Sequence, residues 1–431
     1  MIYSSLNNNS SKVSFKEAVI SGLAPDKGLY FPEKIPKLQN SFIKNIEDLT
    51  EYEIAYESIL PFIKSDIPKK ELKKIIHETL SFKFPLIKIS ENIHSMELYH
   101  GPTLAFKDVG ARFMARCLGY FNKEKKSKEI TVLVATSGDT GGAVADGFLD
   151  VKGINVIILY PSKKVSNIQE KQLTTLGRNI SALEVNGTFD DCQEMVKKSF
   201  LDKDILKSIR LTSANSINIG RWLPQMFYYF FAYKELKKFN KPIVISVPSG
   251  NFGNICAGLL AKKMGLPIDH FIASTNINDV IPRYLKTSKY LPKSSIQTIS
   301  NAMDVGDPSN FIRISKIFNN NYNIIKSNLS GFKFEDNKTK EAIKEIYKDS
   351  NFIADPHGAV GYLGLKKYLK NHNNKIGVFM ETAHPIKFID VVENTLDIKL
   401  KLPEKIKKIL KKEKRSTKIN TYMELKDYLI K

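Results

Sequence analysis

Cysteine is scarce in this sequence, and its spacing excludes several classes of protein. Cys117, Cys192 and Cys256 are the only cysteines among 431 residues, and they form no CxxC pair. A disulfide framework and the common zinc motifs are therefore excluded, and we expect no bound metal. Isolated thiols of this kind are typical of small buried side chains in a reducing compartment.

Membrane-spanning and export signals are also missing. The most aromatic run, Trp222 to Tyr233, carries no charge but is too short to cross a bilayer. The first residues, MIYSSLNNNSSKVSFKEAV, lack the long apolar core of a signal peptide. We therefore expect a cytoplasmic protein with no membrane partner.

Acidic residues are outnumbered, with 45 Asp+Glu against 66 Lys+Arg and a net charge of +21. A large positive charge can indicate nucleic-acid binding. The lysines are scattered, however, and no nucleic-acid motif accompanies the densest run, Lys405 to Lys418. We interpret this run as a solvated helix face or a frayed tail. A non-catalytic basic protein that binds RNA stays an alternative hypothesis, although it leaves the glycine-rich loops described below unexplained.

Short apolar strands alternate with helices along the centre of the chain. A chain of 431 residues is too long for a single hydrophobic core, so we expect two or three domains. Uninterrupted apolar strands between helices are typical of parallel sheets that are covered on both faces. The sequence therefore predicts an α/β protein with two parallel-sheet lobes. The strand patterns lie at 129–136, 154–161, 180–187, 209–215, 242–249, 270–275 and 375–382.

The texture of the sequence suggests four parts. We expect a mostly helical N-terminal domain at 1–88, a first α/β lobe at 89–235, a second α/β lobe at 236–395, and a basic helical C-terminal tail at 396–431.

In open α/β sheets, ligands bind beyond the carboxyl ends of the strands, and polar loops follow several strand patterns here. The first, Ser137 to Thr140, opens an Ala-rich helix in the segment ATSGDTGGAVA. A helix N-terminus presents backbone N–H groups, so this loop can bind a carboxylate or a phosphate. Ser, Thr and Asp are also ordinary helix caps, so a simple capped turn stays an alternative.

The second loop lies in VPSGNFGNICAGLLA at 247–261. No GK[ST] follows its glycines, which excludes a Walker A loop, and the absence of GxGxxG disfavours a dinucleotide. Gly250 and Gly253 allow a ligand to approach the backbone, and a helix follows, so the loop suits a phosphate.

Two further clusters are weaker signals. Asn215, Ser216, Asn218 and Arg221 follow a strand and could hold a second phosphate or a carboxylate, or could form an Asn-rich turn. Thr382 ends a strand in METAHPIKF, where its hydroxyl could bond to a heterocycle nitrogen.

Lys107 stands between the apolar residues Leu104 to Phe106 and Asp108, in HGPTLAFKD. An apolar setting desolvates a lysine, which lowers its pKa and frees the amine. A free amine condenses with an aldehyde, and an aldehyde cofactor that carries a phosphate is pyridoxal 5′-phosphate (PLP). Asp108, Arg112 and Arg116 follow at i, i+4 and i+8, so we expect them to brace one face of the next helix.

Taken together, these segments resemble the threonine synthase family of fold-type II PLP enzymes, in its bacterial and fungal form. Each segment is short, but their joint order and spacing are highly specific. The resemblance runs over most of the chain, except the part past Thr395. The segments are VSFKEAVISGLAPDKGLYFP, HGPTLAFKD, TSGDTGGA, NSINIGR, VPSGNFGN, STNINDVIPR, SNAMDVGDPSNF, DPHGAVGY and ETAHPIKF.

The resemblance implies a fold similar to the β subunit of tryptophan synthase, with the cofactor between two α/β lobes and Lys107 as the catalytic lysine in a Schiff base. It implies that Thr382 faces the pyridine nitrogen. The implied cofactor-binding residues are Lys107, Ser249, Gly250, Asn251, Phe252, Gly253, Asn254 and Thr382. The implied substrate-binding residues are Ser137, Gly138, Asp139 and Thr140 near the carboxylate, and Asn215, Ser216 and Arg221 at the phosphate.

The implied reaction converts O-phospho-L-homoserine and water to L-threonine and phosphate, by γ-elimination and β-addition of water, as the last step of threonine biosynthesis. We expect a small-molecule substrate, no nucleic-acid partner, and a monomer or a dimer. A close alternative is a related phospho-lyase that releases a keto acid. Threonine dehydratase is a more distant one, because its substrate has no phosphate for Arg221 to hold.

Overall fold

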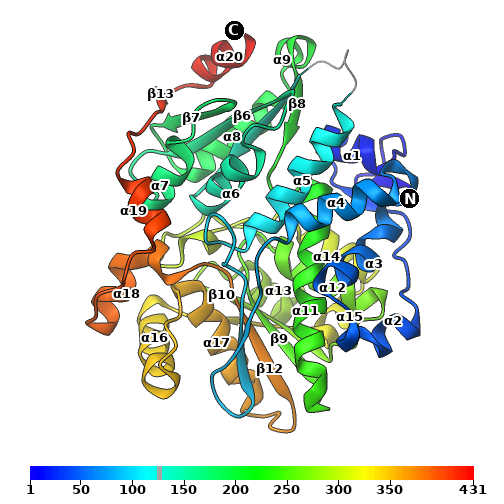
Figure 1. The fold of residues 1–431 in the computed structure, drawn as a ribbon, viewed down its shortest axis with the longest axis vertical. Coiled ribbons are helices and arrows are strands. Elements are labelled where there is room, and N and C mark those ends of the chain that lie inside the picture. The colour runs from blue at the N-terminus through cyan, green and yellow to red at the C-terminus, as the bar shows by residue number, and fades with distance from the viewer. Residues whose placement is uncertain (124–128) are drawn as a thin grey trace.

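Two β-sheets form the framework of the molecule, one in the upper and one in the lower half of Figure 1. The computed structural model describes residues 1–123 and 129–431. The upper sheet has the strand order β13-β7-β6-β5-β8, and all its strands are parallel. Its strands are β5 (Ile130–Ala135), β6 (Ile154–Pro161), β7 (Ile180–Val185), β8 (Arg210–Ser213) and β13 (Thr417–Ile419).

The lower sheet has six strands in the order β11-β10-β9-β12-β4-β3, parallel except for the edge strand β3. Every residue of β9, β10 and β12 is buried. Their apolar runs therefore have the environment expected for covered parallel strands. The strands are β3 (Leu86–Lys88), β4 (Ile93–Glu97), β9 (Ile243–Pro248), β10 (His270–Thr275), β11 (Leu329–Lys333) and β12 (Ile376–Glu381).

Helices connect the parallel strands, which confirms the predicted α/β class. Thr188 and Asp191 form a capping box at the start of α8. The helices of the upper half are α5 (Lys107–Phe121), α6 (Asp139–Phe148), α7 (Asn167–Thr174), α8 (Phe189–Ser199), α9 (Lys203–Ser208) and α10 (Ile219–Trp222). Those of the lower half are α11 (Phe227–Leu236), α12 (Gly253–Met264), α13 (Val280–Thr287), α14 (Phe311–Ile317), α15 (Tyr322–Asn328), α16 (Asp336–Ser350), α17 (Pro356–Leu369) and α18 (Ile389–Leu396).

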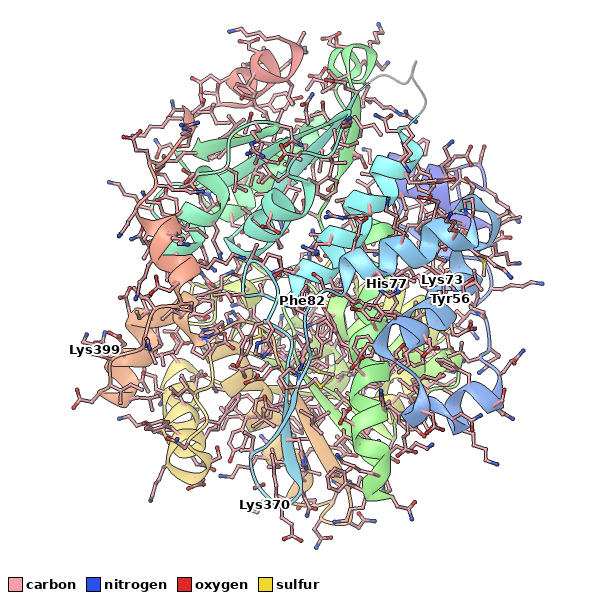
Figure 2. The ribbon with its side chains drawn as sticks, in the orientation of Figure 1. Tyr56, Lys73, His77, Phe82, Lys370 and Lys399 are labelled. Carbon is pink, nitrogen blue, oxygen red and sulfur yellow. The ribbon has the colours of Figure 1, made fainter. Side chains whose placement is uncertain are left out.

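The N-terminal segment packs against the helices that carry Lys107 and Arg221. Helix α4 contacts α5, and α1 contacts both α5 and α10. On its outer face, the Lys73 amine lies 5.3 Å from the centre of the Tyr56 ring, beside His77 (Figure 2). The elements of this segment are β1 (Tyr3–Ser5), β2 (Tyr30–Pro32), α1 (Phe15–Ser21), α2 (Asn40–Lys44), α3 (Glu51–Ile63) and α4 (Lys69–Thr79).

The expected domain limits at 88, 235 and 395 stay a prediction, but the strands do not divide simply along the chain. β4 falls in the range expected for the first lobe, yet it pairs with β12 in the lower sheet. The range 1–88 holds the antiparallel pair β1–β2, and the range 396–431 holds β13. Strands of three residues are too short to show a hydrophobic period, so only their tertiary partners reveal them.

The C-terminal strap, which we define as residues 398–431, runs from the lower half to the top of Figure 1. Helix α19 (Glu404–Leu410) buries Ile406 against Ile168 and Ile386, β13 pairs with β7, and α20 (Tyr422–Ile430) packs on α8 and α9. Lys414 forms ion pairs with Glu170 and Glu184. The frayed tail is therefore wrong, whereas the other interpretation, a solvated helix face, is confirmed: Ile406 of α19 is buried, and Lys407 and Lys408 are exposed.

Many of the remaining basic residues lie at the periphery. Lys370 and Lys399 project from the edges of the molecule in Figure 2, and the Lys399 side chain is 90% exposed. Separately, no helix in residues 1–123 and 129–431 combines the length and the apolar character that crossing a membrane requires.

Ile406 provides a test of the strap. Ile406→Ala removes a fully buried side chain, so the free energy of unfolding should fall by about 3 kcal/mol in urea denaturation. The matched control, Ile430→Ala, alters a side chain that is 41% exposed and should cost less than about 0.5 kcal/mol. Equal small effects would mean that the strap does not contribute to the folded core.

Candidate active site

A cavity of about 110 Å³ lies where loops at the carboxyl ends of both sheets meet. The loops follow β5 and β8 in the upper sheet and β9 and β12 in the lower sheet. The cavity therefore occupies the position that parallel α/β sheets use for ligands. The sequence-predicted residues that line it are Lys107, Ser137, Thr140, Asn215, Ser216, Arg221, Gly250, Asn251, Phe252, Gly253, Asn254 and Thr382.

Lys107 is the first residue of α5, and its half-buried side chain reaches this cavity. Burial lowers the pKa of the Lys107 amine to about 8, and the positive charges of Lys387 and Arg221 act in the same direction. The carboxylate of Asp139 opposes them. The surroundings of this lysine thus lower its pKa, as the apolar sequence around it predicts, and increase the share of neutral amine.

The segment before Lys107 is tied to the end of β12. The Phe106 N–H donates to the Thr382 carbonyl at 2.9 Å, and Ala105 forms an isolated bridge with Ala383. The Tyr228 hydroxyl donates to the Phe106 carbonyl. These bonds fix the point at which α5 begins, so the Lys107 side chain leaves the backbone at a defined place.

Asp108 and the two arginines that follow it have structural partners. The Thr103 N–H and hydroxyl donate to the Asp108 carboxylate at 2.9 and 2.5 Å. Arg112 donates to the Glu78 carbonyl, and Arg116 donates to the Gly147 carbonyl at 2.6 Å. Asp108 therefore closes the lysine loop, whereas Arg112 and Arg116 connect α5 to α4 and α6.

The loop before α6 divides its residues between the cavity and the protein interior. Ser137 and Thr140 line the cavity, whereas Gly138 and Asp139 are not among its lining residues. Gly138 has a φ of 131°, a backbone conformation that favours glycine. The Thr136 hydroxyl oxygen accepts bonds from the Gly138 and Gly141 N–H groups at 2.9 and 2.7 Å. The helix therefore begins at a shaped turn.

Asp139 is 4% exposed and forms an ion pair with Lys387 at 2.6 Å. The Gln169 amide also donates to it at 2.9 Å. Burial alone would raise the pKa of Asp139, but the charges of Lys387 and Lys107 hold this pKa well below its usual value. Sequence patterns did not single out Lys387, although it lies in the segment ETAHPIKF.

The glycine loop between β9 and α12 has a fixed shape. The Asn254 amide donates to the Pro248 carbonyl at 2.9 Å, and the Asn251 side-chain oxygen accepts from the Ser309 N–H at 2.7 Å. A Cβ at Gly250 would lie 2.7 Å from the Met303 Cα. Ser249 is not a lining residue, and its hydroxyl donates to the Val247 carbonyl at 3.0 Å. Glycine at position 250 therefore lets the loop pack closely against the Met303 backbone, and the N-terminus of α12 lies at the cavity.

Arg221 is 4% exposed and reaches the cavity from α10. Its Nη1 donates to the Ala214 carbonyl at 2.5 Å, while its buried Nε has no hydrogen-bond partner among the described residues. Asn215 differs, because its amide donates to the Ala135 carbonyl at 2.8 Å and thus links the ends of β8 and β5. The segment 215–221 therefore presents the Arg221 guanidinium to the cavity, on a backbone that Asn215 holds in place.

Two positioning groups escaped the sequence analysis because their partners are distant in the chain. Arg313 on α14 is fully buried and donates to the Ser216 and Ile217 carbonyls at 3.0 and 2.5 Å. His357 lines the cavity, lies 2.5 Å from Asp355 through Nδ1, and accepts from the Ala302 N–H at 3.2 Å. His357 lies in the segment DPHGAVGY, whereas Arg313 lies two residues past the end of SNAMDVGDPSNF, and no general motif marks either residue.

The residues around the cavity fit PLP. The cofactor needs an amine for its aldehyde, a phosphate site and a partner for its ring nitrogen. Lys107 supplies an amine with a lowered pKa, the glycine loop brings the N-terminus of α12 to the cavity, and Thr382 brings a hydroxyl to the same cavity.

Comparisons with known proteins agree with this fit. A model of the family "Pyridoxal-phosphate dependent enzyme" matches residues 85–380, and models of the threonine synthase N terminus and C-terminal region match 2–80 and 358–429. The threonine synthase of Buchnera aphidicola subsp. Acyrthosiphon pisum is 44% identical over 99% of this chain and 98% of its own length.

Solved structures give the same result. The crystal structure of threonine synthase from Escherichia coli has a TM-score of 0.93 and 38% identity, covering 100% of this chain and 99% of that one. The PLP-bound threonine synthase from Brucella melitensis has a TM-score of 0.91 and 31% identity, covering 100% and 99%.

The fold and the lysine cavity define a PLP-dependent enzyme of fold type II. Within that class, the chain belongs to the threonine synthase family.

Gly250 tests the glycine loop. In Gly250→Ala the new Cβ meets backbone atoms of Met303 and Ala302, so the loop must shift, and PLP affinity should fall by about tenfold or more. The apparent dissociation constant is measured by titrating cofactor-free protein with PLP. Gly142→Ala is the control, because its Cβ makes only an ordinary contact of 3.4 Å with Gln172 and should leave the affinity unchanged.

Proposed function

We propose that this chain converts O-phospho-L-homoserine and water to L-threonine and phosphate. The observation that carries the proposal is the meeting of Lys107, the α12 glycine loop and Arg221 in one cavity of a chain that belongs to the threonine synthase family. One anion site serves the cofactor phosphate, and a second serves the phosphate that leaves the substrate.

Lys107 is the amine that would hold the cofactor aldehyde. Bound PLP supplies an electron sink for the negative charge that develops at the substrate α-carbon. Once the substrate amine takes its place, Lys107 accepts the α-proton at Nζ as a general base. A pKa of about 8 suits this role, because such an amine gains and loses a proton near neutral pH.

The other cavity residues hold the substrate and the cofactor. Ser137 and Thr140, at the N-terminus of the ten-residue helix α6, bind the substrate carboxylate. Arg221 binds the substrate phosphate through its guanidinium, whose Nε lacks a partner among the described residues. Thr382 is the residue that would hold the cofactor's ring nitrogen through a neutral hydroxyl, which would leave that nitrogen less firmly protonated than a carboxylate would.

We also infer a cytoplasmic location. Cys117, Cys192 and Cys256 are all free and buried, which supports a reducing compartment.

The reaction itself is tested by incubating the enzyme with phosphohomoserine and assaying three products together. Threonine and phosphate in equal amounts support the proposal. Release of 2-ketobutyrate and phosphate without threonine would instead identify a phospho-lyase and contradict it.

Lys107→Ala tests the role of the lysine. Turnover should fall by about 10³-fold or more, because the variant lacks both the cofactor amine and the general base. The visible absorbance band of the lysine-bound cofactor should disappear. In the unaltered protein, borohydride reduction and peptide mapping should locate the cofactor on Lys107. Lys399→Ala, at a position whose side chain is 90% exposed, is the control and should retain band and activity.

Arg221→Lys tests the phosphate grip. The charge remains, but the guanidinium fork is lost, so kcat/KM for phosphohomoserine should fall by about 100-fold. The spectral change on adding L-threonine, which has no phosphate, should keep its half-saturating concentration within about twofold. Equal losses for both ligands would show that Arg221 acts on the fold of the site and not on the phosphate.

A further inference from the structure

A second lysine is buried at the edge of the site, and the proposed reaction leaves it without a role. Lys387 lies in the short 3-10 helix η6 (Pro385–Phe388), which follows Thr382. Its side chain has no exposed surface. Its Nζ lies 2.6 Å from the Asp139 carboxylate and donates to the Thr103 carbonyl at 3.0 Å.

This ion pair connects the loops that build the cavity. Asp139 begins α6, Thr103 lies in the loop before Lys107, and Lys387 follows the end of β12. Helix α7 completes the arrangement, because Gln169 donates to Asp139 at 2.9 Å and Gln172 donates to the Thr103 carbonyl at 3.0 Å. The pair is thus buried and well hydrogen-bonded.

Stability alone does not account for such a pair. Removing two charges from water costs about as much as their mutual attraction returns, and apolar side chains often serve equally well. The buried Lys387 ammonium and Asp139 carboxylate therefore indicate an effect on the reactive amine of Lys107.

Charged groups from three elements act on Lys107. Asp139 of α6 favours its protonated form, whereas Lys387 of η6 and Arg221 of α10 favour its neutral form, together with burial. Lys387 in turn faces Asp139 and Asp108 as carboxylates, and His384 on its own element. Lys107 is the other cation that acts on the buried Asp139 carboxylate, so without Lys387 the carboxylate would act on Lys107 alone of these two.

We propose that Lys387 is a positioning residue for the chemistry of Lys107. It holds the Asp139 carboxylate as its own ion-pair partner and so increases the share of Lys107 amine that is neutral and free to react with an aldehyde. This inference rests on the proposed role of Lys107. The two lysines have different roles. Lys107 lines the cavity, whereas Lys387, which is fully buried and bonded to oxygen atoms, sets the charge around Lys107.

The test measures the protonation of Lys107 directly. Full-length protein freed of cofactor is labelled with acetic anhydride from about pH 6 to about pH 11, and mass spectrometry follows the Lys107 peptide, normalised to the exposed Lys399. Three variants are compared with the unaltered chain: Lys387→Met, Asp139→Asn and the double variant.

The expected shifts have opposite signs. Lys387→Met leaves Asp139 to pair with Lys107, so the labelling midpoint should rise by about one pH unit or more, which reduces the neutral amine about tenfold at neutral pH. Asp139→Asn removes the only carboxylate that acts on Lys107 among the charges named above, so the midpoint should fall. The double variant should lie between the two single variants, near the unaltered protein. A purely structural role would not give opposite shifts.

The proposal is overturned if Lys387→Met leaves the midpoint unchanged or moves it downward. If Lys387→Met alone does not fold, the comparison of Asp139→Asn with the double variant decides, because no unpaired carboxylate remains there. Loss of the Lys387 charge must still raise the midpoint, and no rise overturns the proposal. Borohydride mapping of PLP separately reports whether Lys107 holds the cofactor, so failure of that role is distinguished from failure of this one.

Discussion

The site depends on the backbone contact between the lysine loop and the end of β12. The Phe106 N–H bonds to the Thr382 carbonyl, and Ala105 bridges to Ala383, so the start of α5 is held against the lower sheet. The rest of α5 packs against α6 of the upper half and α4 of the N-terminal segment. Lys107 therefore stands at a junction that all three parts of the molecule fix.

The electrostatics of the cavity follow from this junction. Burial weakens the hold of Lys107 on its proton, and one carboxylate with two further cations surrounds it. Burial strengthens each of these interactions, because water screens charges only weakly inside the protein. The net charge of +21 differs from the charges around the cavity. Surface lysines such as Lys399 are solvated, so salt screens their charge.

The C-terminal strap completes the connection between the two halves. Ile406 packs against Ile168 of α7 and Ile386 of η6, and these two elements carry Gln169 and Lys387, the partners of Asp139. The strap thus packs directly on the elements that hold the buried ion pair. The basic run is a solvated helix face with one apolar side, since α19 turns Ile406 inward and leaves Lys407 and Lys408 exposed.

The sequence by itself determined the α/β class, the glycine loop, the polar turn at Ser137 and the importance of Lys107. Apolar strand runs, glycines and an apolar-flanked lysine are local patterns, and the carboxyl ends of parallel strands must share an edge. Tertiary structure alone decided which side chains face the cavity. Asp139 and Ser249 point to protein partners, whereas Arg313 and Lys387 join the site from distant segments. β4 and β13 likewise acquired their places only from their partners. A short strand or a buried charge is stabilised by groups from distant parts of the chain, and no local sequence pattern reveals those tertiary contacts.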